Sequence, residues 1–196
     1  MSKIYYMMGK SSTGKDTLFK RIFSDETLQL KTLVPYTTRP IRDGETEGVE
    51  YFFCDEAKVA EFEAAGKIIE RRDYNTMHGI WTYFTADDGQ VDLVNQDYLV
   101  IGTLESYQKI REYYGKDVLV PIYIEVEDGV RLQRALDRER TQANPKYEEM
   151  CRRFLADARD FSEENLKVAE IERRFVNGDL EETERQIKEF INGNKG

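Results

Sequence analysis

Apolar residues near the start of the chain fall into two patterns, separated by a glycine-rich stretch. A continuous apolar run from Ile4 to Met8 has the length of a buried strand and stops at Gly9. From Lys15 to Phe23, apolar residues recur every three or four positions, which is the spacing of one face of a helix. The pattern therefore predicts that the chain begins with a strand, a loop and a helix.

The same alternation of strand-like and helix-like patterns returns in the second half of the chain. Runs rich in β-branched and aromatic residues predict strands that are covered on both faces, and helical spacing of apolar residues follows each run. The expected strands are 98–101, 118–126 and 174–176, and the expected helices are 105–114, 130–140, 145–161 and 180–191, with a frayed tail over 192–196. Strands that alternate with helices indicate an α/β fold with a parallel sheet.

Residues 50–84 have a different pattern, which predicts an inserted lobe. A helix is expected from Asp55 to Ala65, with Asp55 as its N-cap and Gly66 as the glycine that ends it. Residues 32–48 are rich in Thr, Arg, Pro and Gly, and we expect an ordered loop there. Short antiparallel strands are expected at 51–54, 68–74 and 80–84.

Composition limits the classes of ligand and compartment that fit the chain. Its 196 residues, 40% of them hydrophobic, suffice for one compact core but not for two independent domains. A net charge of −9 leaves no broad basic face for nucleic acid. Cys54, Cys151 and the single histidine, His78, lack zinc-binding spacing, and the cysteines fit reduced thiols. The N-terminal apolar run is too short for a signal peptide and nothing approaches the ~20 apolar residues of a membrane span, so we expect a cytoplasmic protein.

The glycine-rich stretch after the first strand has the G-x-x-x-x-G-K spacing of a phosphate-binding loop. It runs Gly9-Lys10-Ser11-Ser12-Thr13-Gly14-Lys15-Asp16-Thr17, and we expect these nine residues to bind ATP. The glycines let the backbone fold so that successive N–H groups point at a phosphate, and the following helix adds its positive N-terminal end. The side chain of Lys15 then reaches the β- and γ-phosphate oxygens as a point charge, which gives it a catalytic role.

The residue after Lys15 departs from the usual phosphate-loop pattern. A Ser or Thr there normally binds magnesium through its hydroxyl, whereas this chain has Asp16 and places Thr17 one position later. Asp16 through water, or Thr17 through its hydroxyl, is the expected ligand of the Mg²⁺ that accompanies ATP. The alternative is a glycine turn with a solvated lysine, but the strand before the loop and the helix after it favour phosphate binding.

A second run of charged residues indicates where a phosphorylated acceptor binds. Arg39 and Arg42 flank Pro40, which prevents a continuous helix, so both guanidinium groups can project from a stiff loop toward one phosphate. Glu45 is close enough in sequence to hold them in place. The alternative is an ordinary charged surface loop, which the nearby phosphate-loop motif makes less favoured.

These segments, in their order along the chain, resemble the guanylate kinase family. After the phosphate loop come Thr37-Thr-Arg39-Pro-Ile-Arg42-Asp-Gly-Glu45-Thr-Glu-Gly48-Val-Glu-Tyr51, Ile68-Ile-Glu70, Arg152-Arg153 and Phe175-Val-Asn177-Gly-Asp179-Leu. The resemblance covers about residues 4 to 191, and the arginine loop is its most specific part. It implies a P-loop NTPase-type parallel sheet flanked by helices, a small antiparallel lobe that binds the nucleoside monophosphate, and a helical lid. The expected single kinase domain, 1–196, divides into a core of 1–34 and 98–196, a lobe of 35–97 and a lid of about 138–152.

The resemblance also implies an activity and a set of acceptor contacts. The implied reaction is transfer of the γ-phosphoryl group of ATP to GMP. Glu70 would recognise the guanine, because one carboxylate can accept hydrogen bonds from both N1–H and the 2-amino group. The alternative for Glu70 is a solvated acid beside two arginines. The implied GMP-binding residues are Arg39, Arg42, Glu45, Tyr51, Glu70 and His78.

Two segments depart from the family pattern, and they affect the identity of the acceptor more than the type of reaction. The family's Tyr-Gly-Ser/Thr segment, which contacts the phosphate and the base, corresponds to His78-Gly79-Ile80 here. His78 can donate to a phosphate, but Ile80 cannot hydrogen-bond guanine O6, which leaves Thr76 or Thr82 as candidates for that role. The family's Asp-x-Asp corresponds to Gly102-Thr103-Leu104-Glu105, so Glu105 would have to substitute for its acids.

Phosphoryl transfer also requires fixed cations around the transferred group and exclusion of water. Arginines bracket residues 141–149, whose composition suggests a connection between two helices, and this connection is the lid in guanylate kinases. Arg153 matches the family's K/R-R-L and is the expected transition-state arginine, with Arg138 or Arg140 as its partner from the preceding helix. The alternative is that these arginines pair with acids on solvated helix faces.

Three other functions fit parts of the sequence. Ile80 and the missing Asp-x-Asp keep open a related kinase for another phosphorylated acceptor, such as another nucleotide or a ribose bisphosphate. A non-catalytic guanylate-kinase-like module that binds phosphopeptides shares the acceptor loop, but such modules typically lose the phosphate loop. A small GTPase is disfavoured because the sequence has no N-K-x-D motif. Phosphorylation of GMP to GDP is therefore the expected function.

Overall fold

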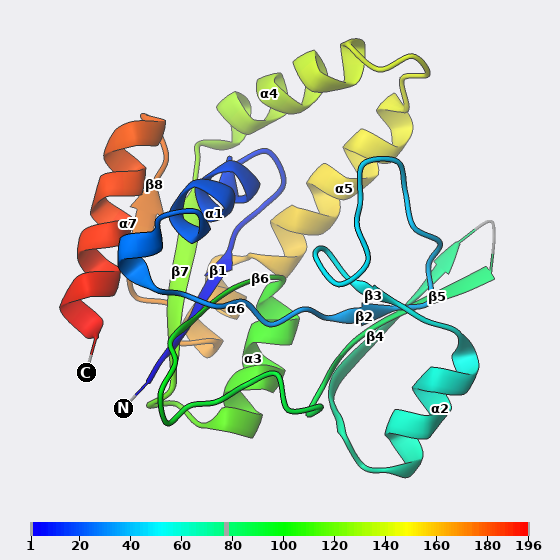
Figure 1. The fold of residues 1–196 in the computed structure, drawn as a ribbon. Coiled ribbons are helices and arrows are strands. Elements are labelled where there is room, and N and C mark those ends of the chain that lie inside the picture. Colours follow the sequence, from blue (N-terminus) through cyan, green and yellow to red (C-terminus); the bar gives the residue numbers. More distant parts are fainter. Residues whose placement is uncertain (1, 77–78, 196) are drawn as a thin grey trace.

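A parallel sheet of four strands forms the centre of the molecule in a computed structural model that describes residues 2–76 and 79–195 (Figure 1). The strand order is β6-β1-β7-β8, and β1 pairs with both of its neighbours in parallel. The strands are β1 (Ile4–Met8), β6 (Tyr98–Ile101), β7 (Leu119–Glu125) and β8 (Arg174–Val176). The expected parallel α/β core is therefore confirmed.

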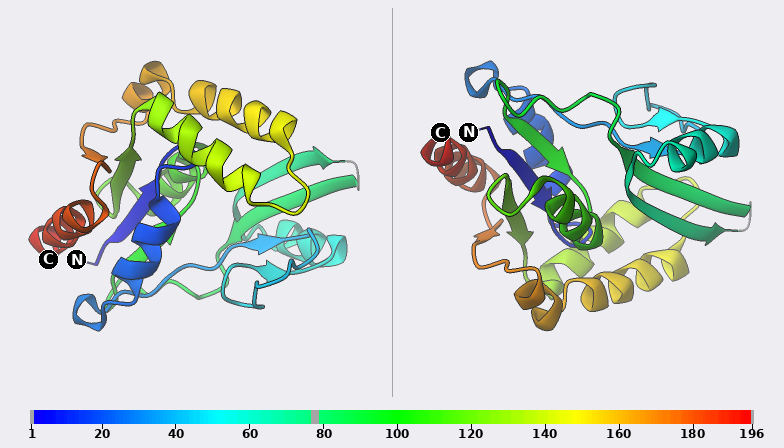
Figure 2. Two further views of the ribbon diagram at one scale, coloured as in Figure 1. Left: turned by 90° about the horizontal axis from the view of Figure 1, so that it is seen from above. Right: turned by 90° about the horizontal axis from the view of Figure 1, so that it is seen from below.

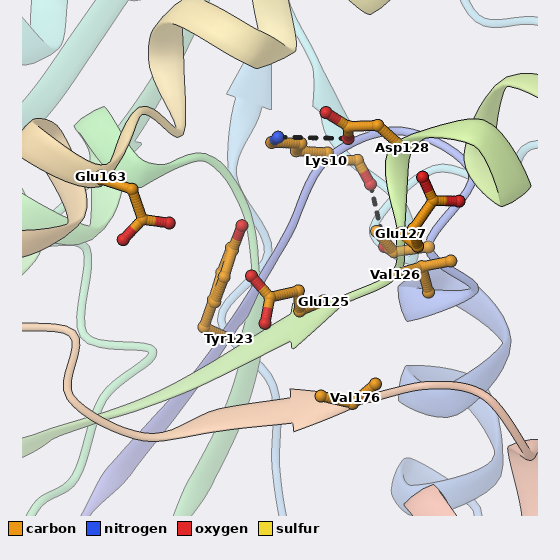
Figure 3. Close-up of a pocket in the computed structure, with 9 residues that line it drawn as sticks. Lys10, Tyr123, Glu125, Val126, Glu127, Asp128, Glu163 and Val176 are labelled. Atoms are coloured by element: carbon orange, nitrogen blue, oxygen red, sulfur yellow. Dashed lines mark hydrogen bonds and ion pairs between the residues drawn. The ribbon is translucent and has the colours of Figure 1, made fainter.

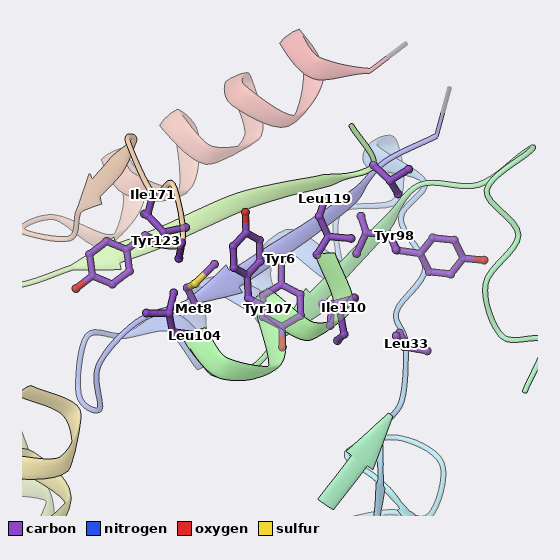
Figure 4. Packing of buried hydrophobic residues seen from close by; sticks show 14 of the residues in the cluster. Tyr6, Met8, Leu33, Tyr98, Leu104, Tyr107, Ile110, Leu119, Tyr123 and Ile171 are labelled. Atoms are coloured by element: carbon purple, nitrogen blue, oxygen red, sulfur yellow. The ribbon is translucent and has the colours of Figure 1, made fainter. Parts of the chain in front are cut away.

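Helices cover both faces of this sheet, and the pattern along β1 explains how. All five residues of β1 are buried, and successive side chains of a strand point to opposite faces. Tyr6 and Met8 pack in one cluster with Tyr107 of α3 (Figure 4), whereas Tyr5 and Met7 pack in a second cluster with Leu18 of α1. The core helices are α1 (Lys15–Phe23), α3 (Leu104–Tyr114), α4 (Asp128–Arg140), α5 (Tyr147–Asp160), α6 (Glu163–Val168) and α7 (Leu180–Asn194), with a 3-10 turn η1 at Glu26–Leu28.

The inserted lobe has its own four-stranded sheet, and that sheet is mixed instead of fully antiparallel. Its order is β3-β2-β5-β4, with antiparallel β2–β5 and β4–β5 pairs. The β2–β3 pair is parallel, which the sequence did not predict, because β2 lies within the segment expected to be a loop. The lobe comprises β2 (Tyr36–Thr37), β3 (Phe52–Phe53), α2 (Glu56–Ala64), β4 (Ile68–Thr76) and β5 (Gly79–Ala86).

Both ends of α2 follow the expected local chemistry, whereas the last helix is longer than expected and one further helix was not expected. The Asp55 carboxylate accepts a hydrogen bond from the backbone N–H of Lys58 at 2.9 Å, and Gly66 has a φ of 64°, so both predicted caps of α2 are confirmed. The expectation of a frayed tail was wrong for residues 192–195, because α7 continues to Asn194 and the Lys195 ammonium donates to the Leu28 carbonyl at 2.8 Å, while Gly196 lies outside the described residues. The short helix α6 was not predicted.

Three parts of the molecule meet at the carboxyl edge of the parallel sheet. The lobe stands on one side of this edge, and α4 and α5 form a helical pair above it (Figures 1 and 2). Loops that follow β1 and β6 reach the same place, as expected for ligand sites of parallel α/β sheets. Within the described residues, no helix combines the length and the apolar content that crossing a membrane requires.

Candidate active site

The loop between β1 and α1 is packed so closely that two of its positions require glycine. A Cβ atom at Gly9 would lie 2.5 Å from the backbone oxygen of Ile124 in β7. Gly14 has a φ of 83°, and a Cβ atom there would lie 2.6 Å from Nδ2 of Asn177. The first glycine allows close approach to the sheet, and the second allows a left-handed turn directly before α1.

The interior of this loop is built to receive an anion. Ser12 and Gly14 both have positive φ values, 65° and 83°, which turn backbone N–H groups toward a common concavity. Helix α1 begins at Lys15 without a side-chain cap, so its first N–H groups and its positive end face the same space. The buried Ser12 hydroxyl has no hydrogen-bond partner among the described residues, and a phosphate oxygen would satisfy it.

Three side chains distant in sequence brace the loop from outside. Asn177 is buried, and its Nδ2 donates to the Thr13 carbonyl at 2.7 Å. The peptide groups of Ser11 are held from α5 and α4: its N–H donates to Asp157 Oδ2 at 2.8 Å, and its carbonyl accepts from Arg131 Nη1 at 2.9 Å. The phosphate loop is therefore fixed to both helices of the lid and to the segment after β8.

Arg131 is the central residue of this bracing, and the sequence did not single it out. Its side chain is 1% exposed, donates to Asp128 Oδ1 at 2.8 Å, and has Nη1 3.6 Å from Asp157 Oδ2. Its guanidinium carbon lies 4.6 Å from the centre of the Phe154 ring. Burial alone would raise the pKa of Asp128, but the cations of Arg131 and Lys10 outweigh it and lower that pKa below its usual value.

Lys15 lines a cleft of about 680 Å³ at the junction of the core, the lobe and the lid. Its Nζ lies 3.3 Å from Asp16 Oδ2, and the Asp16 side chain is 77% exposed. Thr103 lines the wall of the cleft on the core side, and Tyr74 lines the lobe side. Arg153 lines the cleft from α5, so the cleft has a cation on the core side, Lys15, and another on the lid side, Arg153.

The donors beside Lys15 suit Mg²⁺ that is held mainly by nucleotide phosphates. Asp16 and Thr17 are both exposed at the start of α1 and offer one carboxylate and one hydroxyl. No group of three or more His, Cys, Asp or Glu side chains arranged to hold a metal ion exists in the part of the chain that the structure describes. Mg²⁺ typically keeps several waters and takes one or two protein oxygens beside substrate phosphates, so these residues fit it.

The lid arginines divide into two groups by position. Arg153 Nη2 lies 3.4 Å from the Ser11 hydroxyl, and Arg138 lines, with Arg153 and Ser12, a hollow of about 180 Å³ between the lid and the phosphate loop. Arg140 is 60% exposed and lies 3.5 Å from Asp137 on its own helix. The structure thus brings Arg138 and Arg153 to the phosphate loop, while Arg140 lies on an exposed face of α4.

The acceptor loop holds Arg39 in a fixed and almost fully buried position. Glu45 accepts two hydrogen bonds from the Arg39 guanidinium, at 2.7 and 2.8 Å, and the Tyr83 hydroxyl accepts a third at 3.2 Å. The Arg39 guanidinium carbon also lies 5.1 Å from the centre of the Tyr51 ring. The bond to Arg39 lowers the pKa of Glu45 below its usual value. Arg42 is exposed, and Glu45 accepts from its backbone N–H at 2.9 Å.

The register of the β4–β5 hairpin decides which side chains share a face with Glu70. Partners in an antiparallel pair point to the same side, so the pairs Glu70–Thr85, Arg72–Tyr83 and Tyr74–Trp81 form one face. Ile80 pairs with Asn75, and the Thr82 hydroxyl donates to Asp73 at 2.6 Å, which places both on the opposite face. Neither Ile80 nor Thr82 therefore faces the same space as Glu70.

Thr76 is the remaining candidate for contact with the base, and it lies on the hairpin face of Glu70. The Thr76 hydroxyl shares the face of Glu70 at the far end of the hairpin, where it donates to the Gly79 carbonyl at 2.8 Å. His78 lies outside the described residues. Among the candidates for contact with the base, Glu70 is bonded to the side chain of its cross-strand partner, Thr85.

Glu70 is buried, and its carboxylate is already bonded within the protein. It accepts from Arg72 Nε at 2.8 Å and Nη2 at 3.2 Å, and from the Thr85 hydroxyl at 2.8 Å. Arg72 Nη1 extends toward the Thr103 hydroxyl on the cleft wall, 3.5 Å away. Burial alone would lower the pKa of Arg72, but the Glu70 carboxylate outweighs it and raises that pKa above its usual value.

A second hollow, of about 420 Å³, lies on the other side of the phosphate loop (Figure 3). Four carboxylates line it, and the ammonium group of Lys10 lies 3.3 Å from Asp128 there. An anionic nucleotide phosphate would be repelled by this lining. The cleft that contains Lys15 and Arg153 is therefore the better candidate for phosphoryl chemistry.

Comparisons with known proteins agree with this geometry. A family model described as guanylate kinase matches residues 1–194. Guanylate kinase from Porphyromonas gingivalis is 25% identical over 194 residues, which cover 97% of each chain. Protein PALS1 from Danio rerio is 27% identical over 188 residues, covering 95% of this chain but only 26% of PALS1.

The solved structures add a match in fold. Guanylate kinase from Anaplasma phagocytophilum has a TM-score of 0.66 and 22% sequence identity, and the match covers 98% of this chain and 85% of that one. At that identity, the similarity supports the architecture alone. The family model, however, extends over all but two residues of the sequence, and this chain belongs to the guanylate kinase family.

Proposed function

We propose that this protein transfers the γ-phosphoryl group of ATP to GMP, giving ADP and GDP. The observation that carries the proposal is a cleft that the phosphate loop lines from the core and that the lobe, which contains the Arg39 loop, lines from the other side. Lys15 lines this cleft from the core, and Tyr74 lines it from the lobe. The centre of the Tyr74 ring lies 5.5 Å from that of Tyr83, whose hydroxyl accepts from Arg39, so contacts between side chains connect the lobe wall of the cleft to Arg39.

On the ATP side, the chain's own residues bind and orient the phosphates. Loop N–H groups and the Ser12 hydroxyl would bind the β-phosphate, and Lys15 would neutralise charge on the bridging and γ-phosphate oxygens. Mg²⁺, held by Asp16 or Thr17 with nucleotide oxygens, would supply further positive charge. Arg153 and Arg138 approach from the lid, where they would meet charge that develops on the transferred group and exclude water.

On the acceptor side, Arg39 supplies a preorganised cation for the GMP phosphate. Its guanidinium donates two hydrogen bonds to Glu45 and is fixed by them, so little conformational entropy is lost when a phosphate binds. Arg42, on the same loop, and Tyr51, beside the Arg39 guanidinium, would complete the phosphate site. The base would then extend along the hairpin face toward Arg72 and Glu70.

Two other functions differ from this one: a non-catalytic module would not use the phosphate loop, and a related kinase would bind a different acceptor. The match to part of PALS1 is compatible with a non-catalytic module, but the constrained glycines and Lys15 favour nucleotide binding. A kinase for another phosphorylated acceptor would use the same ATP site. Within the proposal, the enzyme acts in the cytoplasm in purine nucleotide metabolism.

The direct test is ADP release from ATP and Mg²⁺ with a panel of GMP, dGMP, IMP, AMP, CMP, UMP and small phosphorylated sugars. The proposal predicts turnover with GMP that exceeds turnover with AMP and with both pyrimidine nucleotides. Preference for a phosphorylated sugar would support the rival kinase instead. Absence of turnover with every acceptor, together with binding of a phosphopeptide, would support the non-catalytic module.

A further inference from the structure

The internal bonds of Glu70 leave it little capacity to contact a base. Its side chain is 2% exposed. A carboxylate offers about four acceptor positions, and Arg72 and Thr85 occupy three of them. A guanine that bonded both N1–H and N2–H to Glu70 would have to displace Arg72 and leave its guanidinium without its partner. Removing one member of a buried ion pair is strongly unfavourable.

Arg72, in contrast, keeps donors that Glu70 does not use. The guanidinium has five N–H groups, and Glu70 accepts from two of its nitrogens. The remaining donors include both N–H groups of Nη1, whose contact to the Thr103 hydroxyl is long, at 3.5 Å. The Arg72 side chain is 14% exposed, so it reaches solvent more than Glu70 does.

Arg72 also lies between the two phosphate sites. Its cross-strand partner is Tyr83, whose hydroxyl accepts from Arg39, so Arg72 lies next to the acceptor phosphate site on the same face. On its other side, Thr103 lines the cleft that contains Lys15. A nucleotide with its phosphate at Arg39 and its base on this face would place the base edge near the Arg72 guanidinium.

We propose that Arg72, oriented by Glu70, recognises the acceptor base by donating to its carbonyl oxygen. This inference rests on the proposed function and makes it more specific. Guanine and hypoxanthine both carry an acceptor at O6, whereas adenine carries a 6-amino donor that would face the Arg72 donors. The acceptor class is therefore 6-oxopurine monophosphates, recognised at O6 and not at the 2-amino group. Glu70 is a positioning residue, because it acts through Arg72.

This arrangement and direct recognition by Glu70 predict different substrate preferences. If a carboxylate bonds N1–H and the 2-amino group, then IMP, which lacks the 2-amino group, loses a charge-assisted bond and reacts more slowly than GMP. If Arg72 bonds O6, GMP and IMP present the same group to it. The ratio of kcat/KM for GMP to that for IMP therefore separates the two mechanisms in the wild-type protein.

The experiment measures kcat/KM for GMP, IMP and AMP in the wild type and in Arg72→Met, Glu70→Gln and Arg71→Met. We expect wild-type values for GMP and IMP within about 3-fold and a value for AMP at least about 10²-fold lower. Arg72→Met should lower GMP and IMP equally, by about 10- to 100-fold, because a bond from a charged donor is lost. Glu70→Gln should lower both equally but less, and its GMP to IMP ratio should not change.

The matched control is Arg71→Met, which removes a neighbouring arginine that bonds Asp73 on the opposite face. It should leave all three kcat/KM values within about 2-fold of the wild type. A wild-type preference for GMP over IMP of about 10-fold or more, or loss of that preference in Glu70→Gln, overturns the role of Arg72. Because the wild-type ratio decides without any variant, the test holds even if Arg72→Met does not fold. Absence of turnover with every monophosphate instead refutes the proposed function and this inference with it.

Discussion

Replacing Arg131 by methionine tests whether the lid helices hold the phosphate loop in place. The substitution keeps most of the aliphatic volume and removes the guanidinium. The Ser11 carbonyl then loses its bond, and Asp157, whose side chain is 18% exposed, loses the cation 3.6 Å away. Asp128 is half-exposed, so water can replace Arg131 there at little cost.

The expected loss can be worked from these contacts. A partly buried acceptor left without its donor costs up to about 1–3 kcal/mol, and a partly buried carboxylate left without its cation adds to this. The sum is a destabilisation of about 2–4 kcal/mol. For a domain of this size, each kcal/mol shifts Tm by about 2–4 °C, so the variant should melt about 5–15 °C lower.

The assay is thermal unfolding followed by circular dichroism at pH 7, with Arg185→Met as the matched control. Arg185 makes ion pairs with Glu182 and Glu189 on the exposed face of α7, and its removal should not measurably change Tm. Asp157→Asn should couple to Arg131→Met in a double-mutant cycle, since both hold Ser11. Equal Tm changes for Arg131→Met and Arg185→Met would refute the reasoning.

Arg39→Ala should raise KM for GMP by about 10- to 100-fold, because a charge-assisted bond is lost. ATP affinity, measured by calorimetry, should stay unchanged. Equal losses for both nucleotides would contradict the assignment of Arg39 to the acceptor phosphate. Arg153→Ala should lower kcat more than either affinity, because a lid arginine meets its phosphate fully in the reacting state, and unchanged kcat would exclude this role. Burial raises the pKa of Cys54 to about 11, so at pH 8 an alkylating reagent should modify the exposed Cys151 first. Peptide mass spectrometry measures the two labelling rates, and faster labelling of Cys54 would contradict its partial burial.

Features that depend on neighbouring residues were predicted well from the sequence. The apolar run of β1, the helical spacing of α1 and the Asp55 cap of α2 each depend on a few consecutive residues. The glycine positions of the phosphate loop belong to the same class, because their spacing reflects local backbone geometry. Such signals survive in a single sequence since nothing distant in the chain is needed to produce them.

Features that depend on long-range pairing were missed. Strand β2 has only two residues, and its partners in β3 and β5 are 16 or more positions away, so the segment looked like a loop. The bracing of Ser11 joins residues 120 and 146 positions apart. No periodic pattern distinguishes Arg131 from the other arginines of α4, because its role comes from where α5 and the phosphate loop lie.

The interpretation of the base site shows the same limit. From the sequence, Ile80 removes a contact with guanine, and Thr76 or Thr82 was expected to replace it. The strand register, with an irregularity between Ile68 and Glu70, places Ile80 and Thr82 on the face opposite Glu70 and leaves Thr76 on the same face. The Glu70–Arg72 pair likewise depends on that register, because residues two apart on a strand share a face.

The central claim is that Lys15 and the acceptor loop serve one phosphoryl transfer. Its most direct test is ³¹P NMR of ATP, Mg²⁺ and GMP incubated with the wild type and with Lys15→Met, after both have been shown to be folded by circular dichroism. We expect equimolar ADP and GDP from the wild type, and a rate at least about 10²-fold lower from Lys15→Met, because the lysine neutralises charge that develops during transfer. ADP formation without GDP, or equal rates from the two folded proteins, would contradict the account.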